Sequence, residues 1–351
     1  MTRTTPTERH SGRPVRSERR SATVPVVVAL HVVGIGGMAV ALLVDGGAGA
    51  ITAAMGLAAY ALGLRHAFDA DHIATIDNTT RRLVRADRDA RGVGLWFSLG
   101  HSTVVLGAAL LLALGVNALA PMLDDESSVL RSAADIWGPL VSGTFLLAIA
   151  VVNLVMLRRA LRERGGDASG AHSHQHAGGP VTWALRRFGW STERPARMYL
   201  VGLVFGLGFD TATEIGLLAI TASAALGQVA WYSALPLAVL FAAGMSMLDS
   251  AQGAVARRVY ARAGTGGAGG AGVRARTRVR YDVVVTGVSA LAALGIGTVT
   301  LVQVAVEHAP WPGRVPAASV SLEPYGVVLT VVLLVVWGVG LLALRQSRRE
   351  A

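Results

Sequence analysis

Ionisable and metal-binding side chains are concentrated in residues 65–82, RHAFDADHIATIDNTTRR. This stretch follows an apolar run, 51–64, that has the composition of a membrane span. Ionisable groups at membrane depth are energetically costly unless they are paired, hydrated or bound to an ion, so a cluster of them indicates a functional site. The sequence therefore predicts an ion site in this stretch.

A continuous helix over residues 64–76 would turn by about 100° per residue. His66, Asp69 and His72 then share one face, and Asp77 returns to it. Asp71 falls on the far side, where we expect it to anchor an imidazole of a neighbouring helix or to pair with an arginine. Imidazoles with carboxylates suit Co²⁺, Ni²⁺ or Zn²⁺, whereas Ca²⁺ and Mg²⁺ take oxygen ligands. The pattern indicates a transition-metal site.

A plainer interpretation is a solvated helix end, whose acidic and imidazole groups pair with Arg65, Arg81 and Arg82. Membrane interfaces usually carry a few basic flanking residues, not a dense group of His and Asp directly after an apolar run. We therefore favour the metal site.

The whole chain has the composition of a membrane protein. Its 351 residues are 52% hydrophobic and only 15% charged, with a mean hydropathy of +0.50. The net charge of +10 could suggest a nucleic-acid partner, but the arginines lie in loops between apolar spans, where membrane orientation and anionic lipids account for them. The chain has no cysteine, which excludes disulfides and thiolate ligands.

The hydropathy pattern predicts an all-α, polytopic membrane protein with eight transmembrane helices. The predicted spans are 24–44, 51–72, 93–116, 137–157, 198–224, 229–255, 283–306 and 326–344.

Arginine is abundant on one side of these spans, which places both termini in the cytoplasm. Only Arg131 and Arg314 then fall outside, with Arg65 inside a span. The membrane domain is 23–344, flanked by a disordered basic tail, 1–22, and a short tail, 345–351. Cytoplasmic loops are expected at 158–197 and 256–282, the second rich in Gly and Arg.

The segment HAFDADH, residues 66–72, resembles the HX4DH signature in the second transmembrane helix of the nickel/cobalt transporter (NiCoT) family. Three further segments are similar to family patterns: LGHS around His101, GLGFDTATE with Asp210 and Glu214, and FAAGMSMLDS with Asp249. The resemblance implies that these side chains join the ion site. Asp210 and Glu214 also stand four residues apart, on one helical face.

His31 in the first span is a further candidate ligand, although an isolated intramembrane His also serves as a hydrogen-bonded packing residue. The resemblance links first-helix positions to the preference between nickel and cobalt. His172, His174 and His176 alternate in the loop 158–197, where they could buffer metal ions or form a dispensable polar loop. The last two spans hold no ionisable group in their apolar stretches and are expected to be scaffold.

Spans two and three resemble spans five and six. Phe68-Asp69 corresponds to Phe209-Asp210, and the pattern Phe97-x-x-Gly100-x-Ser102 corresponds to Phe241-x-x-Gly244-x-Ser246. Units three spans apart enter the membrane in opposite directions. We therefore expect an inverted 3+3 repeat with a shared site, followed by two C-terminal helices.

The leading hypothesis is a secondary transporter in the cytoplasmic (inner) membrane that imports Ni²⁺ and/or Co²⁺ as substrates and needs no cofactor. The chain has no GxxxxGK[ST] segment, so an ATP site is not expected. An exporter of related architecture is an alternative. An intramembrane metallohydrolase is a third hypothesis, against which stands the absence of HExxH. A metal sensor would need a soluble effector domain, and no loop is long enough to form one.

Overall fold

The computed structural model describes residues 22–45, 52–113, 129–164, 194–207, 231–264, 273–308, 327–336, 338–339 and 342. Regular structure within these ranges is entirely helical. The helices are α1 (Thr23–Asp45), α2 (Ala53–His66), α3 (Ala70–Arg85), α4 (Val93–Ala113), α6 (Val129–Arg164), the 3-10 turn η1 (Pro195–Arg197), α8 (Met198–Phe205), α10 (Trp231–Gly264) and α11 (Val273–His308).

Five helices in the described ranges are long and apolar enough to cross a membrane: those that contain Thr23–Val44, Val93–Leu111, Ile136–Val155, Leu235–Ala261 and Thr286–His308. Pro195–Phe205 and Val327–Val336 are shorter apolar segments. The predicted all-α, multi-span class is therefore confirmed. Most of the fifth predicted span, 198–224, and a smaller part of the eighth, 326–344, lie outside the described residues.

The second predicted span, 51–72, is not one continuous helix, and this part of the prediction is wrong. α2 ends at His66, and Asp69 precedes α3 with an extended backbone (φ −63°, ψ 140°). The amides of Phe68 and Asp69 bond back to the carbonyls of Arg65 and His66, at 2.9 and 3.0 Å, and close a tight turn. With 14 and 16 residues, α2 and α3 are each too short to cross a bilayer alone, which takes about 20 residues.

Three helices are longer than the spans predicted for them. α6, α10 and α11 contain 36, 34 and 36 residues and run into segments that we expected to be loops. A hydropathy window ends where the chain becomes polar. A helix can continue beyond that point because its backbone hydrogen bonds form equally well outside the bilayer.

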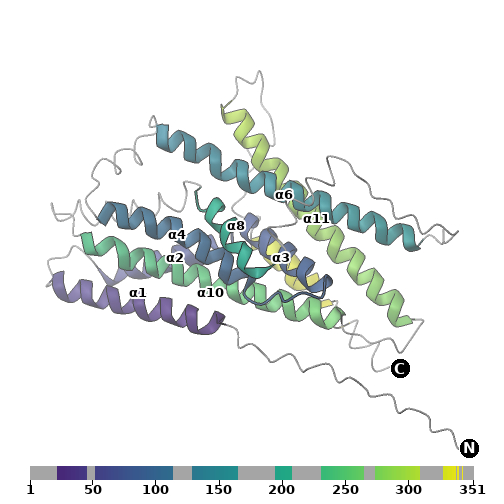
Figure 1. Cartoon of the computed structure of the whole chain (residues 1–351), viewed down its shortest axis with the longest axis horizontal. Helices are drawn as coiled ribbons and strands as arrows, with labels where there is room; N and C mark the ends of the chain where they lie inside the picture. Colours follow the sequence, from purple (N-terminus) through teal and green to yellow (C-terminus); the bar gives the residue numbers. More distant parts are fainter. Residues whose placement is uncertain are drawn as a thin grey trace, which may run out of the picture.

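Helix α10 is the centre of one group of helices (Figure 1). It packs against α1, α2 and α4, and α4 packs in turn against α8. α6 and α11 cross each other as a separate pair. α3 lies between the two groups and contacts α4, α6, α10 and α11. The C-terminal part of the broken span is therefore enclosed by helices, and His72 to Arg81 are all buried.

Glycines allow the backbones of two helix pairs to touch. A Cβ atom at Gly63 of α2 would lie 2.1 Å from the carbonyl oxygen of Phe241 in α10. A Cβ atom at Gly202 of α8 would lie 1.9 Å from the carbonyl oxygen of Phe97 in α4. No side chain fits at such distances. The α2–α10 and α4–α8 contacts thus depend on glycine, as close helix contacts in membranes commonly do.

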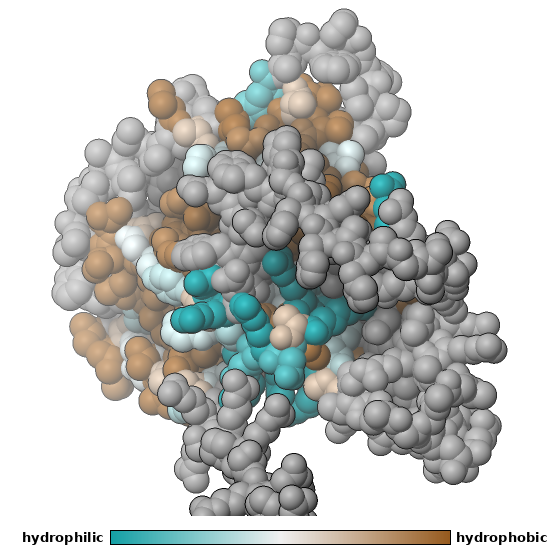
Figure 2. All heavy atoms as spheres, turned by 45° about the vertical axis from the view of Figure 1, so that its right-hand side comes forward, coloured by the Kyte–Doolittle hydropathy of each residue, from teal (hydrophilic) through white to brown (hydrophobic). Residues whose placement is uncertain are grey.

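The outer surface is apolar where it would meet lipid. α1 leaves Val28, Val32 and Leu43 exposed. Figure 2 shows hydrophobic side chains on the left and at the top of the view, and hydrophilic side chains gathered near its middle. The turn between α3 and α4 lies near the start of α1. It uses a left-handed backbone at Asp87 (φ 53°) and Gly92 (φ 77°).

An ion pair stabilises this turn outside the membrane. The Arg91 guanidinium lies 2.8 Å from the Asp89 carboxylate, and its hydrogen bonds hold the pKa of Asp89 below the usual value. Both groups remain partly exposed, so we assign the pair only a small contribution to stability.

The glycine contacts generate a stability prediction. Gly100→Ala should destabilise the protein by at least about 1–3 kcal/mol, because its Cβ would lie 1.9 Å from the Tyr199 carbonyl oxygen. Gly107→Ala on the same helix is the matched control, since nothing lies within 4 Å of its Cβ. Thermal unfolding in detergent measures both. Equal melting temperatures for the two variants would contradict the α4–α8 contact.

Candidate metal centre

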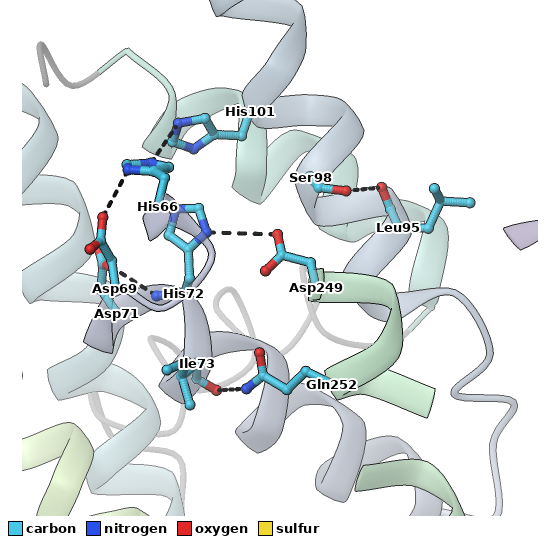
Figure 3. Close-up of polar contacts among 10 residues, drawn as sticks. All are labelled: His66, Asp69, Asp71, His72, Ile73, Leu95, Ser98, His101, Asp249 and Gln252. Carbon is cyan, nitrogen blue, oxygen red and sulfur yellow. Dashed lines mark hydrogen bonds and ion pairs between the residues drawn. The ribbon is translucent and has the colours of Figure 1, made fainter. Parts of the chain in front are cut away.

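Three imidazoles converge at the break between α2 and α3 (Figure 3). His66 is the last residue of α2, His72 lies in the first turn of α3, and His101 comes from α4. The ring centroids are 4.7 Å apart for His66–His72 and 4.9 Å apart for the other two pairs. One ring nitrogen of each residue can be chosen so that all three lie within 4.8 Å of one another. His72 and His101 are buried and His66 is partly buried, so this is a candidate three-nitrogen metal site.

A carboxylate orients the His66 ring. The Nδ1 atom of His66 lies 2.8 Å from an Asp69 carboxylate oxygen, so Nδ1 carries the proton and the lone pair is left on Nε2. That Nε2 lies 3.2 Å from Nε2 of His101. If an ion bound both nitrogens at about 2.1 Å, the N–metal–N angle would be about 100°, which suits octahedral or tetrahedral coordination.

Asp249 of α10 lies beside His72. Its carboxylate oxygen is 3.7 Å from His72 Nδ1, which is too long for a hydrogen bond but close enough for an electrostatic contact. Asp249 is fully buried. A buried carboxylate at this distance adds negative charge without occupying the ligand nitrogen of the ring.

Aromatic rings form an apolar wall around the imidazoles. Phe97 packs edge-on against His72 with centroids 4.8 Å apart, and Phe241 lies 5.8 Å from His66. Both phenylalanines are fully buried. The backbone carbonyl of Phe97 lies against Gly202, and that of Phe241 lies against Gly63. The helix contacts that need glycine thus also build the wall of the candidate centre.

The structure brings together His66, Asp69, His72, His101 and Asp249 from the predicted set. Asp69 contacts Nδ1 of His66 and not the Nε2 atom that faces His101. Asp69 therefore lies where it would orient the His66 ring. Asp71 was expected to anchor an imidazole of a neighbouring helix or to pair with an arginine; among the described hydrogen bonds and ion pairs, its carboxylate instead accepts the backbone N–H of His72 at 2.9 Å. Asp210 and Glu214 lie outside the described residues.

His31 lies away from the imidazole cluster. It donates to or accepts from the Tyr60 hydroxyl at 3.2 Å, and its Nδ1 contacts the Val27 carbonyl at 2.8 Å. Tyr60 precedes His66 by about 9 Å along α2. In the described structure, His31 therefore makes hydrogen bonds to its own helix and to α2. It is not one of the three converging imidazoles.

Asp77 does not face the imidazoles, although a continuous helix would place it on their side. Because α3 starts anew at Ala70, the relevant angle is that between Asp77 and His72, about 140°. Its carboxylate accepts hydrogen bonds from Tyr260 of α10 and Ser289 of α11. Neither of these two partners of Asp77 was predicted from the sequence. The signal for Ser289 was a polar side chain inside an apolar span.

Comparison with known proteins gives the family. The family model described as NicO, high-affinity nickel-transport protein, matches residues 52–344. The nickel transporter NicT of Mycobacterium tuberculosis is 39% identical over 338 residues, which cover 93% of this chain and 88% of the relative. The cobalt transport protein NhlF of Rhodococcus rhodochrous is 41% identical over 277 residues, covering 74% and 76%. No solved structure matches significantly.

The names of these relatives describe transport and not an enzymatic reaction, which agrees with the prediction that the chain is not an enzyme. In those proteins the metal ion is cargo and not a cofactor. The family model extends over all the described helices except α1, and the membrane-capable helices fit a multi-pass transporter. The resemblance to nickel/cobalt transporters is thereby confirmed: the chain belongs to the high-affinity nickel-transport protein family.

Proposed function

We propose that this protein is a secondary transporter that imports Ni²⁺ and/or Co²⁺ across the cytoplasmic membrane. His66, His72 and His101 bind the ion, Asp69 orients the His66 ring, and Asp69 and Asp249 balance the charge. The observation that carries the proposal is the convergence of three imidazoles at a helix break within the membrane domain. The names of the nickel and cobalt transporters among its relatives support this choice of ions.

The depth of the imidazole cluster supports a transport site. His101 lies near the middle of the apolar segment Val93–Leu111, and Asp249 lies near the middle of Leu235–Ala261. Transporters commonly bind substrate near the bilayer midplane at interrupted helices.

The ligand chemistry supports a late transition metal. Neutral imidazoles bind Ni²⁺ and Co²⁺ well, whereas Mg²⁺ and Ca²⁺ prefer oxygen. Three neutral ligands would leave the ion with both its charges in an apolar surrounding. The carboxylates of Asp69 and Asp249 compensate them, which lowers the cost of burying the ion.

Reciprocal contacts support the inverted repeat. Gly63 of α2 faces the Phe241 carbonyl, and Gly244 of α10 faces the Tyr60 carbonyl. In the same way Gly202 of α8 faces the Phe97 carbonyl of α4, and Gly100 faces the Tyr199 carbonyl. Gly63 and Tyr60 correspond to Gly202 and Tyr199, in a register that sets Phe209 two residues beyond the position of Phe68, and Gly100 and Phe97 correspond to Gly244 and Phe241. We therefore propose that α2 and α8 are equivalent, as are α4 and α10, in the 3+3 arrangement followed by two C-terminal helices.

We propose eight spans with both termini in the cytoplasm, and the distribution of arginine supports this for the N-terminal end of α1. The starts of α1 and α4 lie at the same end of the molecule, because Gly92 approaches Thr23. Arginines gather near that end, in the C-terminal parts of α3 and α10, in the turn after α3 and in the segment before α8: Arg82, Arg85, Arg257, Arg258, Arg88, Arg91, Arg194 and Arg197. By the positive-inside rule this end is cytoplasmic.

The imidazole assignment predicts loss of transport. His66→Ala, His72→Ala and His101→Ala should each lower ⁶³Ni²⁺ accumulation at least about tenfold at subsaturating metal, because each removes a ligand. His308→Ala is the matched control, since this exposed ring contacts only its own helix in the described structure. Uptake is measured in cells, normalised to folded protein in the membrane. Near-normal uptake by all three variants would refute the site.

Import predicts a dependence on membrane potential. An inside-negative potential favours entry of a divalent ion by about 4.6 kcal/mol per 100 mV, twice the value for a single charge, or about a thousandfold at equilibrium. Proteoliposomes with the protein in its cellular orientation should accumulate ⁶³Ni²⁺ when the potential is imposed and lose the gradient when it is collapsed. Movement of the ion only from the cytoplasmic to the outer face would identify an exporter instead.

A further inference from the structure

A second polar cluster surrounds Asp77, away from the imidazoles. The Asp77 carboxylate is fully buried and accepts hydrogen bonds from the Tyr260 hydroxyl and from the Ser289 hydroxyl, the latter at 3.1 Å. Tyr260 belongs to α10 and Ser289 to α11. Arg81, one turn further along α3, is also buried. A single carboxylate thus joins α3 to two other helices.

The next residue extends these connections to a third helix. Asn153 of α6 donates to the side-chain oxygen of Asn78 at 2.5 Å, and Arg81 donates to the same oxygen at 2.7 Å. Asn78 itself donates to the Ala74 carbonyl at 2.6 Å. Hydrogen bonds therefore link α3 to both members of the α6–α11 pair, and none of these groups takes part in the described imidazole cluster.

These bonds matter because α3 is separated from α2 by the break. A continuous helix would fix the position of His72 through its own backbone hydrogen bonds. Across the turn at 67–69, the depth and rotation of α3 must instead be set by packing and by side-chain bonds. Asp77 lies only about 7.5 Å beyond His72 along the helix axis. Metal–ligand distances tolerate errors of only about 0.2 Å, so small shifts of α3 would change ion binding.

We propose that Asp77 is a positioning residue for the ion site. Held by Tyr260 and Ser289, it fixes α3 so that His72 meets His66 and His101 in the geometry that binds the ion. The α6–α11 pair, which supplies no ring to the imidazole cluster, thereby controls ion affinity. This inference rests on the proposed role of His72 as a ligand, and it assigns a function to α11 beyond that of a scaffold.

The experiment compares Ser289→Ala, Tyr260→Phe and Asp77→Asn with the unchanged full-length protein in detergent. Co²⁺ serves as the probe, because its visible absorption reports coordination geometry. We expect Asp77→Asn to weaken Co²⁺ binding by about tenfold, as loss of an indirect partner of a metal site commonly does, and to change the absorption bands at saturating Co²⁺. Ser289→Ala and Tyr260→Phe should weaken Co²⁺ binding less than Asp77→Asn does. Combined with Asp77→Asn, either substitution should cause no further loss of affinity.

Thr286→Val on the same face of α11 is the matched control. Thr286 accepts a hydrogen bond at 2.7 Å from Arg85 of α3, but Arg85 is exposed and water can replace the bond. This variant should keep the affinity and the spectrum of the unchanged protein. Melting temperatures separate positioning from a loss of folding.

Three results would overturn the inference. In the first, Asp77→Asn, Ser289→Ala and Tyr260→Phe lower the melting temperature but keep the spectrum and affinity, which would make the cluster purely structural. In the second, Thr286→Val shows the same loss of Co²⁺ binding as Ser289→Ala. In the third, the unchanged protein binds no Co²⁺, which would overturn the ion site itself together with this inference. Binding by the unchanged protein without accumulation in proteoliposomes would instead count against the transport proposal alone.

Discussion

The proposed ion site depends on the cost of holding a divalent cation in an apolar environment. An unpaired charge buried in a membrane domain is strongly disfavoured, so an ion site there needs ligands, counter-charges and a backbone that can present both. The break between α2 and α3 meets these requirements. It places His66 and His72 at the ends of two short helices and leaves Asp69 in the turn between them. His101 and Asp249 then complete the centre from α4 and α10.

Close helix contacts make this arrangement possible. Gly63 lies against the backbone of α10 three residues before the end of α2, and Gly202 lies against α4. These contacts bring Phe241 and Phe97 to the imidazoles, where they exclude water. On the other side of α3, the Asp77 cluster joins the broken span to α10 and α11. Both halves of the broken span thus pack against α10, and α3 is joined in addition to α6 and α11.

The sequence predicted the helical class and most of the apolar spans, because hydropathy measures the property that places a helix in lipid. It also singled out His66, His72, His101 and Asp249, which the structure brings together, since ionisable groups are rare in such spans. It did not predict the break, because residues 64–76 contain neither glycine nor proline. Tertiary contacts decide that the helix ends at His66. The error carried over to Asp77, whose direction depends on where α3 begins, and to Asp71, which bonds to the adjacent backbone amide.

X-ray absorption at the nickel edge tests the central claim most directly, because it reports the ligands of the bound ion independently of transport. For the full-length protein loaded with one equivalent of Ni²⁺, we expect the multiple-scattering signature of three imidazoles with nitrogen atoms at about 2.0–2.1 Å. One imidazole should be lost in each of the His66→Ala, His72→Ala and His101→Ala variants. A shell of oxygen atoms without imidazole, or an unchanged spectrum in these variants, would contradict the assignment of the ion to this centre.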